Sequence, residues 1–260
     1  MTLIVGTICK DAIVMGAESE TTRGASKLHG TKKLTIVEFI GGSVIVGEAG
    51  IQFLSNAVVD RFSAIAGKTQ MADRESVART LSESFRAISK ESIAPLLGTK
   101  KCQDYYRQET NYFELTMAFY ADAKPYIYNF NPVWGLASKC PRNFSVSGIG
   151  KDLSEYLLKD IPFEEMDSRA ATLEIANVVR EVKTSVSGCG GNTEIALVSN
   201  GSKPEKLNHS ALSIMEQKIL FLSEKYRSER RRSIEESKKT LLFGYQSGSD
   251  EQTVGPVKDE

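Results

Sequence analysis

Strand-like and helical segments are grouped along this chain, and the grouping limits the folds it can adopt. Period-two and β-branched patterns predict strands at 3–9, 12–16, 33–39 and 43–46, and three- and four-residue apolar spacing predicts helices at 51–66 and 74–90. The same signals then predict strands at 113–121, 125–131 and 144–147, helices at 153–159 and 169–186, and a strand at 193–199. Grouped strands and grouped helices favour stacked α+β layers rather than alternating βαβ units.

The chain changes character after residue 200. The apolar residues Leu212, Met215, Ile219, Leu222 and Tyr226 recur at helical spacing, and a run of mixed charges follows them. We therefore predict a core domain over residues 2–203 and, over residues 204–260, a C-terminal helix and a charged tail that is disordered from about residue 246. Segment 92–111 is predicted to be a long connection.

The charge and composition of the chain limit the classes of partner and cofactor that we expect. Lys and Arg total 33, as do Asp and Glu, so the net charge is zero and nothing calls for a nucleic acid or an anionic membrane as partner. No apolar run approaches the roughly 18 residues of a membrane-spanning helix, and no secretory signal begins the chain, so we expect a cytoplasmic protein. Four widely spaced cysteines and two histidines offer little basis for a zinc site, and we expect no metal or organic cofactor.

Thr2 directly follows the initiator methionine and begins the first predicted strand. Removal of Met1 would leave an amino group and a hydroxyl group on one residue, and an adjacent N-terminal amine is a known activator of a threonine hydroxyl. The α-amino pKa of about 7.7–8.0 would supply a neutral base near pH 7 without a histidine.

Five short motifs in order resemble proteasome β-type subunits. They are Thr2-Leu-Ile-Val-Gly6, Cys9-Lys-Asp11, Gly16-Ala-Glu18, Lys32-Lys33-Leu34 and Val46-Gly47-Glu-Ala-Gly50. The resemblance implies the α+β fold of the N-terminal-nucleophile (Ntn) hydrolases, a four-layer αββα sandwich of two antiparallel sheets between helical layers. It also implies a threonine-type endopeptidase that hydrolyses peptide bonds through an acyl-enzyme ester on Thr2.

The resemblance assigns a role to each matching residue. Thr2 would be the nucleophile and Lys33 the cation beside it, Glu18 would hold that lysine, and the N–H of Gly47 would face the developing oxyanion. Substrate would be bound by Thr21, Ile45 and Ala49 around the specificity pocket, which suits a medium-sized hydrophobic side chain. Thr22 would lie on a strand that pairs with the substrate backbone.

The sequence departs from active β subunits at two orienting positions. Ile149 lies where a serine is usual, between Gly148 and Gly150, and Val186 lies where an aspartate is common, before Cys189-Gly190-Gly191. Ser147, Ser185 and Ser187 lie near these positions and are candidate substitutes.

Two other functions therefore stay open: an Ntn amidohydrolase or acyl or peptide transferase with a different substrate, and a catalytically inactive structural ring subunit. For the peptidase, the resemblance implies an unfolded polypeptide or peptide substrate. It also implies a homo-oligomeric ring, alone or together with α-type subunits or an ATPase.

Overall fold

The computed structural model describes residues 2–23, 26–28, 30–71, 73–93, 113–131 and 136–246. The chain divides into two compact units, Met1–Glu216 and Gln217–Glu260. The predicted connection at 92–111 lies almost wholly outside the described residues, and the predicted tail does so from residue 247 onward.

Two antiparallel five-stranded sheets form the centre of the first unit. One has the order β10-β1-β2-β11-β12, with bounds Phe144–Gly148, Leu3–Ile8, Ala12–Glu18, Thr193–Ser199 and Glu205–Lys206. The other has the order β5-β6-β7-β8-β9, with bounds Leu34–Phe39, Gly42–Gly50, Phe113–Ala121, Lys124–Asn131 and Leu136–Lys139. A separate two-stranded hairpin consists of β3 (Thr21–Arg23) and β4 (Ser26–Leu28).

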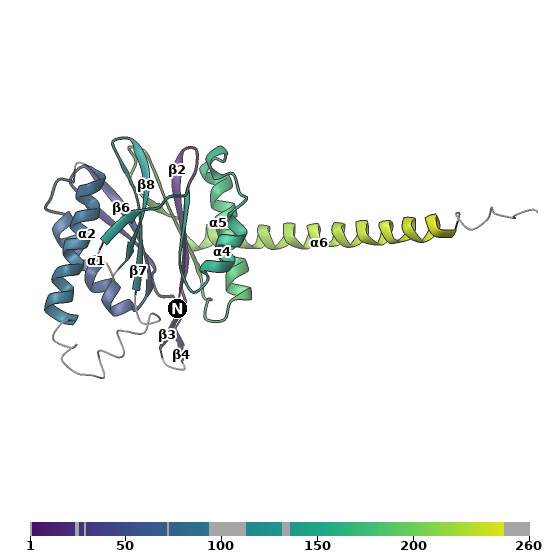
Figure 1. Ribbon diagram of the computed structural model, residues 1–260, viewed down its shortest axis with the longest axis horizontal. Coiled ribbons are helices and arrows are strands. Elements are labelled where there is room, and N and C mark those ends of the chain that lie inside the picture. The colour runs from purple at the N-terminus through teal and green to yellow at the C-terminus, as the bar shows by residue number, and fades with distance from the viewer. Residues whose placement is uncertain are drawn as a thin grey trace, which may run out of the picture. The chain divides into compact units, whose positions relative to one another are not determined.

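Helices cover the outer face of each sheet, so the first unit is a four-layer αββα sandwich (Figure 1). Helices α1 (Gln52–Ala66) and α2 (Arg74–Ile88) pack on the β5–β9 sheet, and α4 (Lys151–Leu158) and α5 (Ser168–Ser185) pack on the other. Asp73 begins α2 with a reciprocal capping box to Ser76, and the Asp167 carboxylate accepts the Ala170 N–H at 2.8 Å at the start of α5. Short helical turns occur at η1 (Ser89–Ile93) and η4 (Phe163–Glu165). The predicted fold class is confirmed.

The hydrophobic core consists of two clusters, and alternate side chains of the central strands contribute to one or the other. On β6, Val44 and Val46 belong to the apolar cluster under α1 and α2, whereas Ile45 and Ala49 belong to the cluster between the two sheets. Successive side chains of a strand point to opposite faces, so a strand that is buried on both faces reads as a nearly continuous apolar run.

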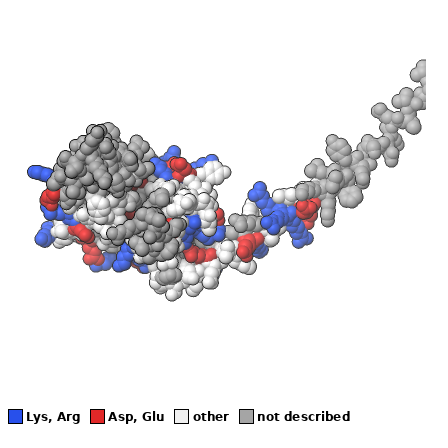
Figure 2. Space-filling view, turned by 90° about the horizontal axis from the view of Figure 1, so that it is seen from below, with Lys and Arg blue, Asp and Glu red and all other residues white. Residues whose placement is uncertain are grey.

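The last helix, α6, spans His209–Gln246 and is longer than the 212–226 stripe that predicted it. Its polar continuation carries ion pairs one helical turn apart, Lys225–Glu229 and Arg232–Glu236. Figure 2 shows basic and acidic side chains interspersed over the visible face rather than separated by sign. No helix in the described part of the chain is both long and apolar enough to cross a bilayer.

Candidate active site

Thr2 lies directly before β1 and beside the turn that follows β10. The residue is 1% exposed, and its carbonyl oxygen accepts the N–H of Ile149 at 2.9 Å. Leu3 is paired with Gly148 in the β1–β10 ladder. Thr2 is therefore held through its backbone by this turn.

The Glu18 carboxylate at the end of β2 accepts three backbone N–H groups. Oε1 accepts from Leu3 at 3.1 Å, and Oε2 accepts from Glu20 and from Gly190, each at 2.8 Å. Burial raises the pKa of the Glu18 carboxyl, and the three N–H donors and the charge of Lys33 oppose that rise. One buried carboxylate thus ties the residue after Thr2 to β2 and to the loop that leads into β11.

Lys33 lies directly before β5 and is 2% exposed. Its Nζ donates to Thr21 Oγ1 at 2.8 Å, and within the described chain it forms no direct ion pair with Glu18. Burial lowers the pKa of the Lys33 amine, and the charges of Glu18, Glu48 and Glu194 counteract this. Lys33 and Glu18 are therefore close enough for their charges to interact. The hydrogen bond that orients the lysine is the one that its Nζ donates to Thr21.

Gly47 lies on β6, opposite Leu34 of β5 and Thr116 of β7. A Cβ atom on Gly47 would come within 2.5 Å of Ile4 Cγ2 and 2.9 Å of Met15 Cε, which belong to the opposite sheet. Glycine at this position thus has a packing reason of its own, because it lets the two sheets approach each other closely.

The four residues expected to bind substrate occupy different environments. Thr21 is half-buried at the start of β3 and accepts the Lys33 bond, and Thr22 follows it, paired with Lys27 of β4. Within the described residues the other edge of β3 has no partner strand. Ile45 is fully buried and Ala49 is 3% exposed, and both belong to the apolar cluster between the two sheets.

The positions that depart from active β subunits lie around the same site. Ile149 is exposed and binds Thr2 through its backbone N–H, and Val186 is the residue that ends α5. The Ser147 hydroxyl shares a 2.8 Å hydrogen bond with Thr116 Oγ1 between the sheets. Ser185 and Ser187 are both exposed.

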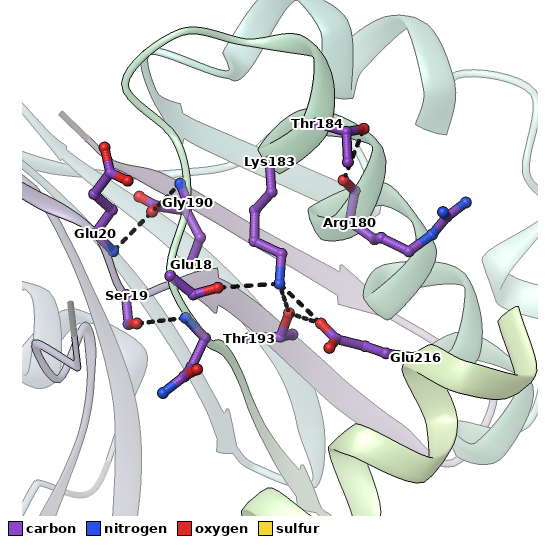
Figure 3. A network of polar contacts seen from close by, with 11 residues as sticks. Glu18, Ser19, Glu20, Arg180, Lys183, Thr184, Gly190, Thr193 and Glu216 are labelled. Atoms are coloured by element: carbon purple, nitrogen blue, oxygen red, sulfur yellow. Dashed lines mark hydrogen bonds and ion pairs between the residues drawn. The ribbon is translucent and has the colours of Figure 1, made fainter. Parts of the chain in front are cut away.

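Several contributing residues were missed by the sequence reasoning. Ser19 Oγ accepts the N–H groups of Gly30 and Asn192, and the Glu194 carboxylate accepts the Lys33 N–H at 2.9 Å. Lys183 extends from α5 toward β11 and the start of α6, where Nζ donates to Thr193 Oγ1 and Glu216 Oε1, each at 2.8 Å (Figure 3). These residues are distant in sequence from Thr2 and form no motif with it, so no local signal identifies them.

No described residues gather three or more His, Cys, Asp or Glu side chains in an arrangement that could hold a metal ion. A cavity of about 430 Å³ lies at the other end of the sandwich, where Ser199 pairs with Ala12 near the turns after β5, β7 and β11. It is separate from the Thr2 site, because Thr193, at the opposite end of β11, pairs with Glu18.

The known proteins to which the chain is similar are all solved structures. No protein-family model matches the chain, and no curated protein does. The chain is similar to "Anbu (ancestral beta-subunit)" from Yersinia bercovieri at 10% identity, with a TM-score of 0.66 over 97% of this chain and 100% of that one. It is similar to the protein of the "Helical Assembly of the Anbu Complex from Pseudomonas aeruginosa" at 16% identity, with a TM-score of 0.69 over 87% and 96%. An Anbu (Gly-1) mutant from Hyphomicrobium sp. strain MC1 matches at 12% identity, with a TM-score of 0.69 over 92% and 100%.

These neighbours correct one prediction. The expectation of a proteasome β-type subunit is wrong, because these three similar structures, which are matched over 96–100% of their own length, are Anbu proteins. The short motifs along β1, β2 and β6 reflect the geometry of the sandwich fold. They therefore did not distinguish proteasome β-type subunits from Anbu proteins. The chain has a proteasome-related fold of the Ntn type.

Proposed function

We propose that this chain is an Anbu-like amide hydrolase of the Ntn type, with Thr2 as its nucleophile after Met1 is removed. The observation that carries the proposal is the buried Lys33 amine, which is 2% exposed, donates to Thr21 Oγ1 at 2.8 Å and lies in the same part of the fold as Glu18, the carboxylate bound to the N–H of Leu3. In the proposed mechanism this cation lies near the Thr2 hydroxyl, where it would lower the free energy of the alkoxide.

The reaction follows from these groups. The neutral Thr2 amine takes the Oγ1 proton through a water molecule, and the oxygen attacks the carbonyl carbon of an amide bond. The oxyanion is stabilised by the Lys33 ammonium, whereas the N–H of Gly47 faces Thr116 in the β6–β7 ladder. The C–N bond then breaks, the leaving amine takes the proton, and water hydrolyses the ester on Thr2.

Peptides or unfolded polypeptides are the proposed substrates. The open edge of β3, at Thr21 and Thr22, would pair with the substrate backbone, and Ala49 would lie beside the pocket.

An epoxyketone probe tests the proposal, because that warhead bonds to both the amine and the hydroxyl of one residue. Intact mass should show loss of Met1 and one adduct per chain, and Thr2→Ala should give none. Thr7→Ala is the matched control: Thr7 is also buried on β1, but its hydroxyl donates to the Asn143 carbonyl at the far end of the strand. Retained Met1, or no adduct on processed protein, would instead favour a structural subunit.

Self-assembly is also proposed, since the Pseudomonas aeruginosa Anbu protein is described as a helical assembly. Native mass spectrometry of the full chain should give a species several times heavier than 28.6 kDa. A monomer at micromolar concentration would contradict it.

A further inference from the structure

A glutamate on β7 reaches the turn that holds Thr2. Glu114 is exposed, and its Oε2 accepts the N–H of Gly148 at 3.0 Å. The next N–H along the chain, from Ile149, binds the Thr2 carbonyl. The Glu114 carboxylate is therefore fixed one residue away from the backbone contact that positions the nucleophile.

Glu114 also adjoins the proposed substrate pocket. It is the direct cross-strand partner of Ala49, and such partners place their Cβ atoms about 4.5–5.5 Å apart on one face of the sheet. Ala49 Cβ lies 3.4 Å from the position that a Cβ on Gly148 would take, and that position is 1.8 Å from the Thr2 carbonyl oxygen. Ala49, Gly148, Glu114 and the Thr2 backbone thus form one cluster.

The strand order separates Lys33 from Glu114. Lys33 precedes β5, Glu114 is the second residue of β7, and β6 lies between them. Neighbouring strands are about 4.8 Å apart, so the two backbones are separated by roughly 10 Å. Lys33 bonds Thr21 on β3. A substrate that pairs with β3 and runs past Thr2 toward Glu114 would place the residue after the scissile bond beside the Glu114 carboxylate.

We infer that Glu114 selects substrates with a basic side chain on the residue that follows the scissile bond. This inference rests on the proposed function. One carboxylate oxygen accepts the Gly148 N–H, and the side chain is exposed, so its other oxygen can pair with a lysine or arginine side chain of a substrate. The preference belongs to the leaving-group side and is separate from the pocket around Ala49.

The test uses internally quenched peptides that are identical except for lysine, norleucine or glutamate after the scissile bond. For the wild-type protein, kcat/KM should be about three- to tenfold higher with lysine than with norleucine, and lower again with glutamate, as expected for a charge pair near solvent. The difference should shrink at about 1 M salt, where the screening length is about 3 Å.

Glu114→Gln should bring the lysine-to-norleucine ratio to about one, because the amide carbonyl still accepts the Gly148 N–H while the charge is gone. Glu114→Lys should favour the glutamate peptide. Glu205→Gln, which changes an exposed glutamate on β12, should leave the ratio unchanged. The melting temperature of each variant should be compared with that of the wild type, so that a folding defect can be recognised.

The outcomes separate the two proposals. Absence of any turnover or adduct in the wild type overturns the proposed function and this inference with it. Turnover with no lysine preference, or a preference that survives Glu114→Gln, overturns this inference alone. An equal loss of rate for all three peptides in Glu114→Gln, with a shifted pH profile, would also overturn it, because Glu114 would then position the Thr2 amine rather than the substrate.

Discussion

The carbonyl oxygen of Thr2 lies 1.8 Å from the position that a Cβ atom on Gly148 would occupy. Gly148 has a φ of +92°, a conformation that L side chains rarely adopt. The end of β10 and the start of β1 therefore meet at a distance that only glycine permits, and this contact sets where the proposed nucleophile lies.

Gly148→Ala should destabilise the fold by about 3 kcal/mol or more and displace Thr2, because the steric overlap adds to the conformational cost. Urea unfolding measures the loss, and probe adduct formation reports on the displacement. Gly41→Ala is the matched control, since Gly41 has a φ of +100° with no atom within 4 Å of its added Cβ. It should lose only about 1–2 kcal/mol and keep its reactivity. Equal losses for both variants would contradict a steric role for the Thr2 contact.

Glu18→Gln should destabilise the protein by about 2–4 kcal/mol and reduce adduct formation. A glutamine has one acceptor oxygen in place of two, so either the Leu3 N–H or the N–H groups of Glu20 and Gly190 lose their acceptor. Each buried group left unpaired costs about 1–3 kcal/mol. The control is Glu38→Gln, because Glu38 forms an exposed ion pair with Lys203 at 3.0 Å. It should stay within about 0.5 kcal/mol of wild type. A Glu18→Gln variant as stable as the control would show that the three N–H groups find other acceptors.

Activity should follow a bell-shaped dependence on pH. The rising limb reflects deprotonation of the Thr2 amine, at about pH 7.7–8.0. Burial lowers the pKa of Lys33 from its ordinary value of 10.5, so the falling limb, where the ammonium loses its proton, should lie below pH 10.5. Measuring kcat/KM from about pH 6 to about pH 11 covers both limbs.

Lys33→Arg separates this effect from general alkaline damage, because a guanidinium keeps its charge throughout. Any residual activity should lack the falling limb. A falling limb at the same pH in both proteins would show that Lys33 is not its cause.

The lowered pKa of Lys33 also means that the unfolded chain binds this proton more tightly than the folded one. The protein should therefore lose stability as pH falls from 10.5 through the folded pKa of Lys33.

Lys183→Met should lower the free energy of unfolding by about 1–3 kcal/mol, because Lys183 joins α5, β11 and Glu216 of α6 in a half-buried network. Its Nζ also donates to the carbonyl of Gly191, next to the Gly190 N–H that binds Glu18, so adduct formation should slow as well. Lys151→Met, which removes an exposed pair with Glu155 at 3.9 Å, is the control and should change stability by less than about 0.5 kcal/mol. Identical melting curves for Lys183→Met and wild type would contradict the anchoring role.

The strands and helices of the sandwich could be predicted because their signals are local. Apolar periodicity located α1, α2 and α5 to within a few residues, and the strands at 113–121 and 193–199 have the predicted bounds. The short strands β4, β9 and β12 were missed, and periodicity did not locate β3, which only the family resemblance indicated at Thr22. Two to four residues carry too little periodicity to stand out. The motifs named the fold correctly but the family wrongly, because they reflect the geometry of a shared sandwich.

Local patterns in the chain were sufficient for the layered fold, for the position of Thr2 behind Met1 and for a lysine and a glutamate close to the first strands. How these groups are used depends on contacts between elements that lie far apart in the sequence. Lys33 acquires a threonine partner, Glu18 acquires three backbone donors, and Glu114 comes to lie beside the turn at Gly148. The physical reason is that period and propensity act over a few residues, whereas burial, hydrogen bonding and pKa depend on which strands stack across the space between the sheets.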